Sequence, residues 1–158
     1  MDERLRWIAF WSPNTLTPMK KVLKNALGRV FLTVEYNEKA NWVYNNWIGY
    51  QSFDSIVSGA NACAEVLSQH NCSFLLNDNR QIIGPWNHAV EWIATDWTPR
   101  AIAAGLRYFA HVVDTDSLAK LSSEEMKQTA DGFEMQIFGD IEEATAWLAA
   151  HQQVTQQA

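Results

Sequence analysis

Asp78 and Arg80 are the charged residues best placed to do chemistry in this sequence, because they directly follow a short apolar run. Residues 72–77 contain Ser-Phe-Leu-Leu, which is typical of a buried central strand. In open α/β sheets, ligands bind outside the carboxyl ends of the strands. Asp78 and Arg80 could therefore grip the polar head of a ligand or a loop of a partner. The alternative is a local ion pair or an Asx-type turn that caps the following segment.

Three residues further along the chain could contribute to a binding site at the same edge. Arg100 follows Pro99 in the first turn of a short expected helix, where its guanidinium could bind an anion through two hydrogen bonds. The alternative is that the Arg100 stem packs on an aromatic ring such as Trp97 and that its head holds a carboxylate. Trp86 and Trp97 lie in the same region, and tryptophan rings line grooves and interfaces as well as filling cores and their rims.

The sequence lacks the spacing of a catalytic or metal-binding constellation. Its histidines do not share metal-ligand spacing such as H-x-x-x-H, and no nucleophile is spaced to match them. The patterns G-x-S-x-G and G-x-G-x-x-G and the phosphate-loop pattern are absent. We therefore expect no catalytic residue, no metal, no cofactor and no enzymatic activity. The histidines are His70, His88, His111 and His151.

The charge and composition of the chain exclude several classes of partner. Its 158 residues carry a formal net charge of −6, whereas nucleic acids and anionic lipids attract basic surfaces. No apolar run approaches the length of a membrane span, and the stretch from Trp7 to Trp11 is too short for a signal peptide. We therefore expect a cytoplasmic protein that binds no nucleic acid and does not insert stably into a membrane. Cys63 and Cys72 lack C-x-x-C spacing, so we expect buried free thiols.

Alternation and helical periodicity predict a single α/β domain over residues 29–151. An extension, residues 1–28, precedes it and contains a short helix over 18–27, and a disordered Gln-rich tail, residues 152–158, follows it. Strands are predicted at 29–36, 41–49, 72–77, 106–113 and 133–138. Helices are predicted at 52–70, 86–96, 99–104, 122–130 and from 140 onward.

The order of these elements predicts a mixed sheet of four or five strands with helices packed against it. The short link over residues 37–40 makes the first two strands an antiparallel hairpin. After the hairpin, strands and helices alternate, which implies right-handed crossovers and parallel pairing. Ser52 and Asp140 are expected to cap the helices that follow them, and Ser122 with Glu125 offers a capping box.

Three segments of the chain carry a resemblance to a protein family. They are Phe74-Leu-Leu-Asn-Asp-Asn-Arg80, Trp97-Thr-Pro-Arg-Ala-Ile-Ala-Ala-Gly-Leu106 and Phe138-Gly-Asp-Ile-Glu-Glu-Ala-Thr-Ala-Trp-Leu148. These segments are similar to the strand-to-loop region, the helix before the fourth strand, and the closing strand and helix of SpoIIAA-like, STAS-like proteins of bacteria, also described as STAS/SEC14-domain proteins. The likeness covers residues 29–149 and concerns the fold, because these motifs carry no reaction.

The resemblance implies a mixed sheet of four or five strands and two different uses for it. The anti-sigma-factor antagonists among these proteins exchange partners when a Ser or Thr after the central strand is phosphorylated, at a helix N-terminus that favours phosphate. Residues 78–88 contain no Ser or Thr, so we expect no such switch here. The SEC14-like lipid-transfer relatives hold apolar ligands between a sheet and mobile helices, a use that the Trp and aliphatic content of residues 82–109 would suit.

Two hypotheses of function follow from the residues and the resemblance. The first is a non-enzymatic regulatory or interaction module that binds a protein partner, or a second copy of itself, through an exposed face bearing Trp86 and Trp97. The second is a carrier or sensor of a small apolar or amphipathic ligand, which predicts an enclosed apolar pocket of about 300–1,000 Å³. In either case Asp78, Arg80 and Arg100 are the polar candidates for the binding site.

Overall fold

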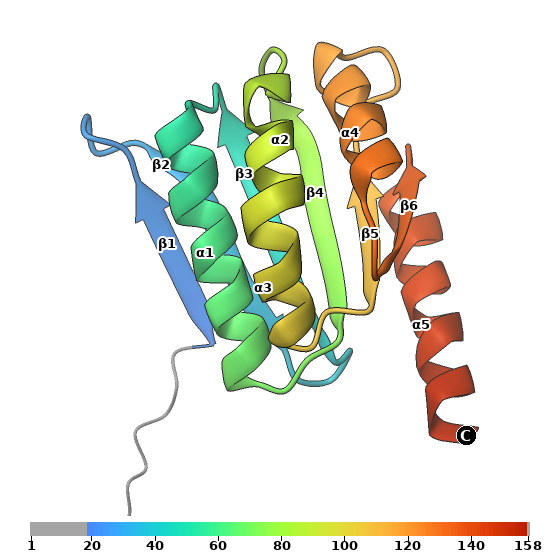
Figure 1. Ribbon diagram of the computed structural model, residues 1–158. Coiled ribbons are helices and arrows are strands. Elements are labelled where there is room, and N and C mark those ends of the chain that lie inside the picture. Colours follow the sequence, from blue (N-terminus) through green and yellow to red (C-terminus); the bar gives the residue numbers. More distant parts are fainter. Residues whose placement is uncertain (1–18, 158) are drawn as a thin grey trace, which may run out of the picture.

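A six-stranded sheet organises the part of the chain that the computed structural model describes, residues 19–157, with side chains as far as residue 154 (Figure 1). The strands lie in the sheet in the same order as in the sequence. The first three pair antiparallel and the remaining neighbours pair parallel, which confirms the mixed α/β sheet expected from the sequence. The strands are β1 (Lys20–Lys24), β2 (Val30–Asn37), β3 (Trp42–Gly49), β4 (Phe74–Ile82), β5 (Tyr108–Val112) and β6 (Glu134–Phe138).

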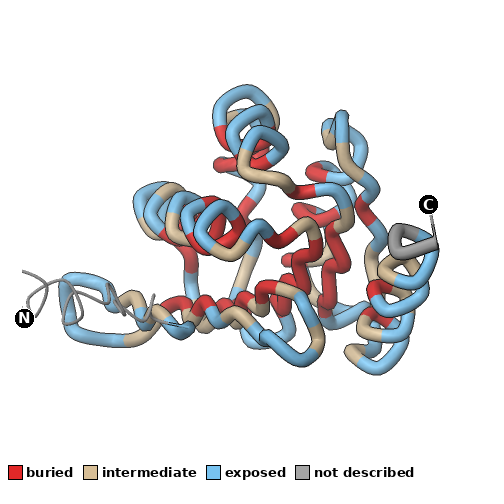
Figure 2. Tube along the Cα trace, turned by 90° about the horizontal axis from the view of Figure 1, so that it is seen from below, coloured by how far each residue is buried: buried red, intermediate tan, exposed pale blue. Residues whose placement is uncertain are grey.

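The helices that connect parallel strands lie on one side of the sheet, which we call the front face (Figures 1 and 2). From β3 to β6 each crossover leads to the next strand in the same direction, and right-handed crossovers then place their helices on the same side. The last helix packs on the opposite, back face against β4, β5 and β6. The helices are α1 (Phe53–Gln69), α2 (Val90–Trp92), α3 (Thr98–Ala103), α4 (Leu118–Thr129) and α5 (Ile141–Gln157).

Residues 87–103 form one uninterrupted helical run in place of the two separate helices expected there. A 3-10 turn, η3 (Asn87–Ala89), leads into α2, and a π-helical turn, η4 (Ile93–Trp97), joins α2 to α3. In the π turn the N–H of Thr98 bonds to the carbonyl oxygen of Ile93. Pro99 follows at the start of α3, where its missing N–H costs little. The expected break before Pro99 is therefore wrong, because the wider turn accommodates the proline.

Residues 20–24 form the edge strand β1, where the sequence predicted a short helix. β1 pairs antiparallel with β2, with Lys20 opposite Glu35 and Leu23 opposite Leu32. The burial of the segment alternates as in a strand, and pairing with the open edge of β2 decides between strand and helix. The expected helix is therefore wrong, and the sheet begins ahead of the boundary placed at residue 29. The first 18 residues of the expected extension lie outside the described residues.

Two boundaries near the centre of the sheet also differ from those expected. β4 continues to Ile82 instead of ending near Asn77, because β3 pairs with it as far as Gly49. α4 begins after Ser117, so Ser122 lies inside the helix and the expected capping box is wrong. Ser122 is buried, and its Oγ accepts a hydrogen bond (2.9 Å) from the backbone N–H that precedes η3. A tertiary contact therefore uses the hydroxyl that the sequence pattern assigned to a helix cap.

The last helix extends through the tail that was expected to be disordered. α5 continues to Gln157, and the Gln152 side chain donates hydrogen bonds to two carbonyl oxygens of the turn between β2 and β3. The caps expected at Ser52 and Asp140 are confirmed. Ser52 Oγ and Asp140 Oδ1 accept hydrogen bonds of 3.1 Å and 2.6 Å from backbone N–H groups in the first turns of α1 and α5.

α1 approaches the front face most tightly at Gly59. A Cβ atom at this position would lie 2.6 Å from the Leu32 side chain and closer still to the Trp47 ring. Leu32 and Trp47 are opposite each other in β2 and β3. Real Cβ atoms essentially never come this close to another atom. The missing side chain at Gly59 therefore sets the distance between α1 and the Trp47 ring.

Gly59→Ala is expected to lower the free energy of unfolding by about 1–3 kcal/mol, because the added methyl group overpacks the contact between helix and sheet. At an unconstrained helix position the same change would add about 1 kcal/mol of stability. Ser58→Ala, on the exposed side of α1, is the matched control and should change stability by less than about 0.5 kcal/mol. Urea unfolding followed by circular dichroism measures both variants. A Gly59→Ala protein as stable as the wild type would contradict the close approach.

Candidate functional site

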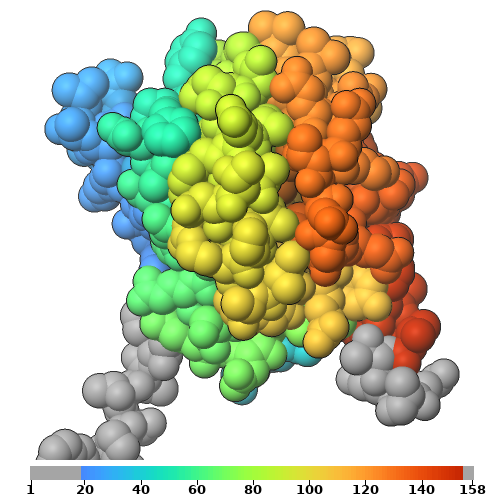
Figure 3. Space-filling view, viewed as in Figure 1, coloured from blue at the N-terminus to red at the C-terminus, as the bar shows by residue number. Residues whose placement is uncertain are grey.

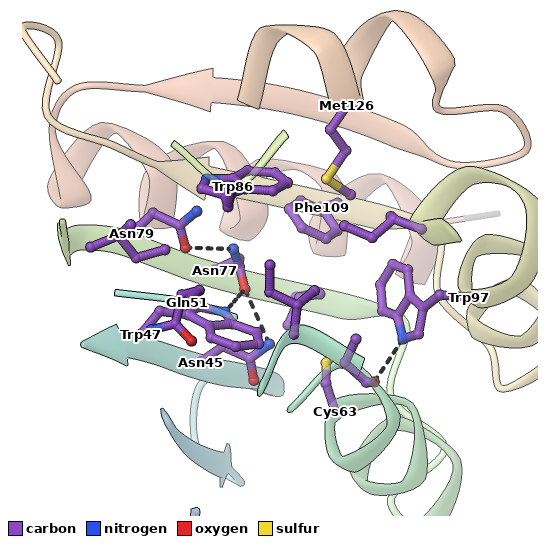
Figure 4. A pocket seen from close by; sticks show the side chains of 15 residues that line it. Asn45, Trp47, Gln51, Cys63, Asn77, Asn79, Trp86, Trp97, Phe109 and Met126 are labelled. Atoms are coloured by element: carbon purple, nitrogen blue, oxygen red, sulfur yellow. Dashed lines mark hydrogen bonds between the residues drawn. The ribbon is translucent and has the colours of Figure 1, made fainter. Parts of the chain in front are cut away.

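A cavity lies on the front face between the sheet and the helices that cover it. α1, the 87–103 run and α4 lie side by side over this face (Figure 3). The space open to the centres of water-sized spheres is about 50 Å³, several times the roughly 10–15 Å³ that one water needs. Its polar lining residues are Asn45, Gln51, Asn77 and Asn79, and its other lining residues are Trp47, Ile56, Ala60, Cys63, Leu75, Ile82, Trp86, Ile93, Trp97, Phe109 and Met126 (Figure 4).

Three asparagine side chains on β3 and β4 form the polar wall of this cavity. Asn77 Oδ1 accepts hydrogen bonds from Asn45 Nδ2 (3.1 Å) and from Trp47 Nε1 (2.9 Å). Asn77 Nδ2 lies 3.1 Å from Asn79 Oδ1 and 3.2 Å from His111 Nδ1 on β5. An indole N–H can only donate, so the oxygen of Asn77 must face Trp47. The amide nitrogen of Asn77 therefore faces Asn79 and His111.

The orientation of Asn77 decides which nitrogen of the buried His111 ring carries the proton. Asn77 Nδ2 donates, so His111 Nδ1 accepts and the proton of the neutral ring lies on Nε2. His111 Nε2 then donates to Ser123 Oγ (2.7 Å), and Ser123 donates to the carbonyl oxygen of Ala119 (2.8 Å). Burial lowers the pKa of His111 to about 3, against a smaller opposing effect of Asp78. The ring is therefore neutral at neutral pH.

Ser123, His111 and Asn77 lie in a chain that resembles a serine nucleophile with its base, but their chemistry differs. A general base must take up a proton near the working pH, and His111 has a pKa of about 3. Ser123 is fully buried, and its hydroxyl donates a hydrogen bond to a backbone carbonyl oxygen instead of to His111. Cys63 and Cys72 are buried free thiols, as expected, and burial raises the pKa of Cys63 to about 12. Within the described residues, the groups lining the cavity are therefore uncharged and not activated as nucleophiles.

Two fully buried polar atoms of the lining have no hydrogen-bond partner among the described residues. They are Trp86 Nε1 and Asn45 Oδ1, on residues that are 4% and 1% exposed. The Asn45 side chain adjoins the Cys63 thiol, which is a weak donor. Buried polar groups are paired in about 90% of cases or more. An unpaired indole N–H beside a cavity therefore indicates a place for a ligand or a bound water.

Asp78 and Arg80 lie on the back face, and the cavity lies on the front. Side chains alternate along β4, so Asn77 and Asn79 line the cavity while Asp78 and Arg80 point away from it. Arg80 donates to both carboxylate oxygens of Asp78 (2.9 and 2.8 Å), and Tyr44 donates to one of them (2.8 Å). Burial alone would raise the pKa of Asp78, but the hydrogen bonds from Arg80 and Tyr44 hold it below its usual range. Asp78 and Arg80 thus form the local ion pair that was expected as the alternative to a ligand site. Both residues lie within strand β4 and not in a turn.

Arg100 also lies away from the cavity, on the exposed side of the helical run. It forms an ion pair with Asp96 (2.6 Å), a hydrogen bond with Asn61 Oδ1 (2.8 Å) and a contact over the Trp92 ring, 5.9 Å from its centroid. The alternative expected for Arg100 is therefore confirmed in its carboxylate contact with Asp96. The aromatic contact differs, because the guanidinium group and not the stem lies over a ring, and the ring is that of Trp92 instead of Trp97. The structure brings none of the three charged candidates into the cavity.

Trp86 and Trp97 are walls of the cavity and not part of an exposed face. They are 4% and 3% exposed, and both line the cavity. Trp97 Nε1 donates to the carbonyl oxygen of Ala60 on α1 (2.6 Å), which fixes its ring between the two helices. The expected exposure of these two rings is therefore wrong, because the helical run turns both of them toward the sheet. Their part in binding stays a prediction.

Four polar residues at or behind the cavity wall were not among those expected at the site: Asn45, Asn77, Asn79 and His111. A signal for two of them was present, because asparagine is depleted in strands. Asn45 lies in the middle of one predicted strand and Asn77 at the end of another. Polar residues at inward positions of a buried strand need partners, so these two asparagines indicated a buried polar group.

The described part of the chain offers no ready metal site, since no group of three or more His, Cys, Asp or Glu side chains gathers there. Within residues 19–157, no helix is long and apolar enough to cross a bilayer. A scan against protein-family models, a search of curated proteins and a search of solved structures each find no match to the chain. The fold and the cavity therefore carry the functional argument by themselves.

The stability of the protein is expected to fall at mildly acidic pH, because the fold holds His111 neutral. Between the ordinary pKa of 6.5 and the folded pKa of about 3, the unfolded chain binds a proton that the folded chain does not. The free energy of unfolding therefore decreases as the pH falls through this window, by at most about 1.4 kcal/mol per pH unit. Urea unfolding at about pH 5 and about pH 7 measures the difference.

His111→Gln is expected to remove this contribution to the pH dependence, and His88→Gln, at an exposed position, is expected to keep it. Asp78 does not affect the comparison between pH 5 and pH 7. Its pKa is lowered, so its contribution to the free energy of unfolding is fully present above its ordinary pKa of 3.8 and is lost only as the pH falls below that value. Equal pH dependence in the wild type and in His111→Gln would contradict a buried neutral ring.

Proposed function

We propose that this protein is a non-enzymatic binding module of the STAS-like type that takes a small, uncharged molecule into the front-face cavity. The observation that carries the proposal is the Trp86 indole N–H, which is buried at the cavity without a partner among the described residues. Aromatic and aliphatic walls with a few polar groups are the composition of a ligand site. The module would sense or carry such a molecule.

The size of the cavity limits the ligand. Its volume of about 50 Å³ lies far below the range of about 300–1,000 Å³ for sites that hold drug-sized ligands. An acyl chain, as carried by SEC14-like proteins, would require the front-face helices to move apart. A molecule of a few heavy atoms requires no such movement. The carrier or sensor hypothesis therefore narrows to small ligands.

The chemistry of the lining supports binding over reaction. His111 is held neutral behind the asparagine wall, and Cys63 remains a protonated thiol. The STAS-like assignment is supported by an antiparallel hairpin followed by parallel β-α units. Residues 78–88, which begin in β4, contain no Ser or Thr, so the phosphorylation switch of the antagonist proteins is not part of the proposal.

A regulatory module of this kind would act through a protein partner or a second copy of itself. The partner would contact residues other than Trp86 and Trp97, since both are buried. A ligand seated between α1, the 87–103 run and the sheet touches residues of both helical segments. Ligand binding would therefore shift these helices and so alter the surface that a partner contacts.

Fluorine NMR of the protein labelled with 5-fluorotryptophan tests the proposal against a mixture of small neutral fragments. The signals of Trp47, Trp86 and Trp97, which line the cavity, are expected to shift. The signals of Trp92 and Trp147, which do not line it, are expected to stay unchanged. Unmoved cavity signals across the whole mixture, or shifts confined to Trp92 and Trp147, would overturn the proposal.

A pair of variants in α1 provides the control. Ala60→Leu fills the cavity from its helical wall and is expected to abolish the fragment shifts. Ser58→Leu adds the same side chain on the exposed side of the helix and is expected to leave them. Should Ala60→Leu fail to fold, the pattern of shifts in the wild type still decides the question.

A further inference from the structure

We propose, as a refinement that rests on the proposed function, that the ligand presents a neutral carbonyl-type oxygen to two donors, Trp86 Nε1–H and the Nδ2 amide of Asn79. Both side chains line the same cavity, so both donors are available to one ligand. Figure 4 shows the Trp86 ring above the Asn77 and Asn79 amides in the view drawn.

Trp86 is the first of the two donors. Its indole nitrogen can only donate, and no acceptor among the described residues accepts a hydrogen bond from it. The backbone N–H of the same residue is already bonded to Ser122 Oγ on α4 (2.9 Å), so the residue is held in place without its side-chain donor. The ring is thus positioned by packing and by the backbone, and its N–H remains available to an acceptor from the cavity.

Asn79 is the second donor, and its orientation follows from Asn77. Asn77 Nδ2 donates to Asn79 Oδ1 (3.1 Å), so the oxygen of Asn79 faces its neighbour and the amide nitrogen faces away. That nitrogen makes no hydrogen bond to any described residue, and Asn79 as a whole is 4% exposed. Two unused N–H donors in one cavity fit an oxygen that accepts two hydrogen bonds, as a carbonyl does.

The charge of the surroundings favours a neutral oxygen over a carboxylate. The lining contains no Lys, Arg, Asp or Glu. Arg80, the cation nearest in sequence, lies on the back face and is paired with Asp78. A carboxylate would therefore lose its water without gaining a counter-charge, which is strongly unfavourable. The remaining lining is mainly aliphatic and aromatic and would contact the apolar part of the ligand.

The test compares acetone with isobutene, which has the same carbon frame and a CH₂ group in place of the oxygen. The ketone is expected to bind about tenfold more tightly, the usual effect of one hydrogen bond. The indole proton of Trp86, assigned with Trp86→Phe, is expected to move downfield with the ketone and not with the alkene. This chemical shift is measured in the wild type, so the result does not depend on the folding of a variant.

Asn79→Asp removes the amide donor and keeps an acceptor for Asn77, and it is expected to weaken binding of the ketone by about tenfold. Asn37→Asp, at an exposed position of β2 where the new side chain keeps the acceptor for the Ala40 N–H, is the matched control and is expected to leave the affinity unchanged. Equal affinity for ketone and alkene, or an unmoved Trp86 proton, would overturn the carbonyl assignment and leave the proposed function in place.

Other outcomes separate the two proposals. If neither compound binds while other fragments shift the cavity tryptophans, the carbonyl assignment is overturned and the ligand site stands. If no fragment shifts those signals, the proposed function fails as well. A water that stays bonded to Trp86 Nε1 in a structure with the ketone would also overturn the assignment, because the donor would then serve the solvent.

Discussion

The amide of Asn77 is the group on which the polar interior of this protein depends. A buried amide must satisfy both its oxygen and its nitrogen, and Asn77 does so with side chains of β3, β4 and β5. Because Trp47 can only donate to it, the amide has one orientation. That orientation sets the tautomer of His111, the direction of the bond from His111 to Ser123 on α4, and the unused donor of Asn79. One hydrogen-bonded side chain thus aligns three strands and a helix at the cavity.

The two faces of the sheet carry different polar groups, uncharged amides and indoles on the front face and an ion pair on the back face. Because each crossover leads in the same direction, α1, the 87–103 run and α4 cover one face and enclose uncharged amides and indoles. The ion pair of Asp78 with Arg80 lies on the other face, where the Arg80 side chain is 42% exposed and the Asp78 side chain is buried. An isolated buried charge would be costly, and Arg80 supplies the counter-charge. Alternation along a single strand therefore places neutral groups at the cavity and the charged pair on the opposite face.

Much of the fold could be predicted from local patterns. The hairpin of β2 and β3, the helix capped by Ser52 and the helix capped by Asp140 all depend on residues close together in the sequence, and all are confirmed. The errors arose where a distant partner decided the outcome. β1 is a strand that pairs with the edge of β2, and Ser122 lies inside a helix, where its hydroxyl accepts a hydrogen bond from the distant backbone of Trp86. Of the residues that line the cavity, Trp86 and Trp97 were among those expected at a binding site, and the asparagines were not.

Local patterns in the sequence account for the order and type of most elements, because periodicity and composition are local properties. The face that each side chain occupies, and with it the absence of charge from the cavity lining, depends on how strands and helices pack. Asp78 and Asn79 are adjacent in the chain, yet one joins an ion pair on the back face and the other lines the cavity, because neighbouring residues of a strand point to opposite faces. The cavity lies on the front face because the strands pair, and the helices pack on the sheet, through contacts between residues far apart in the chain.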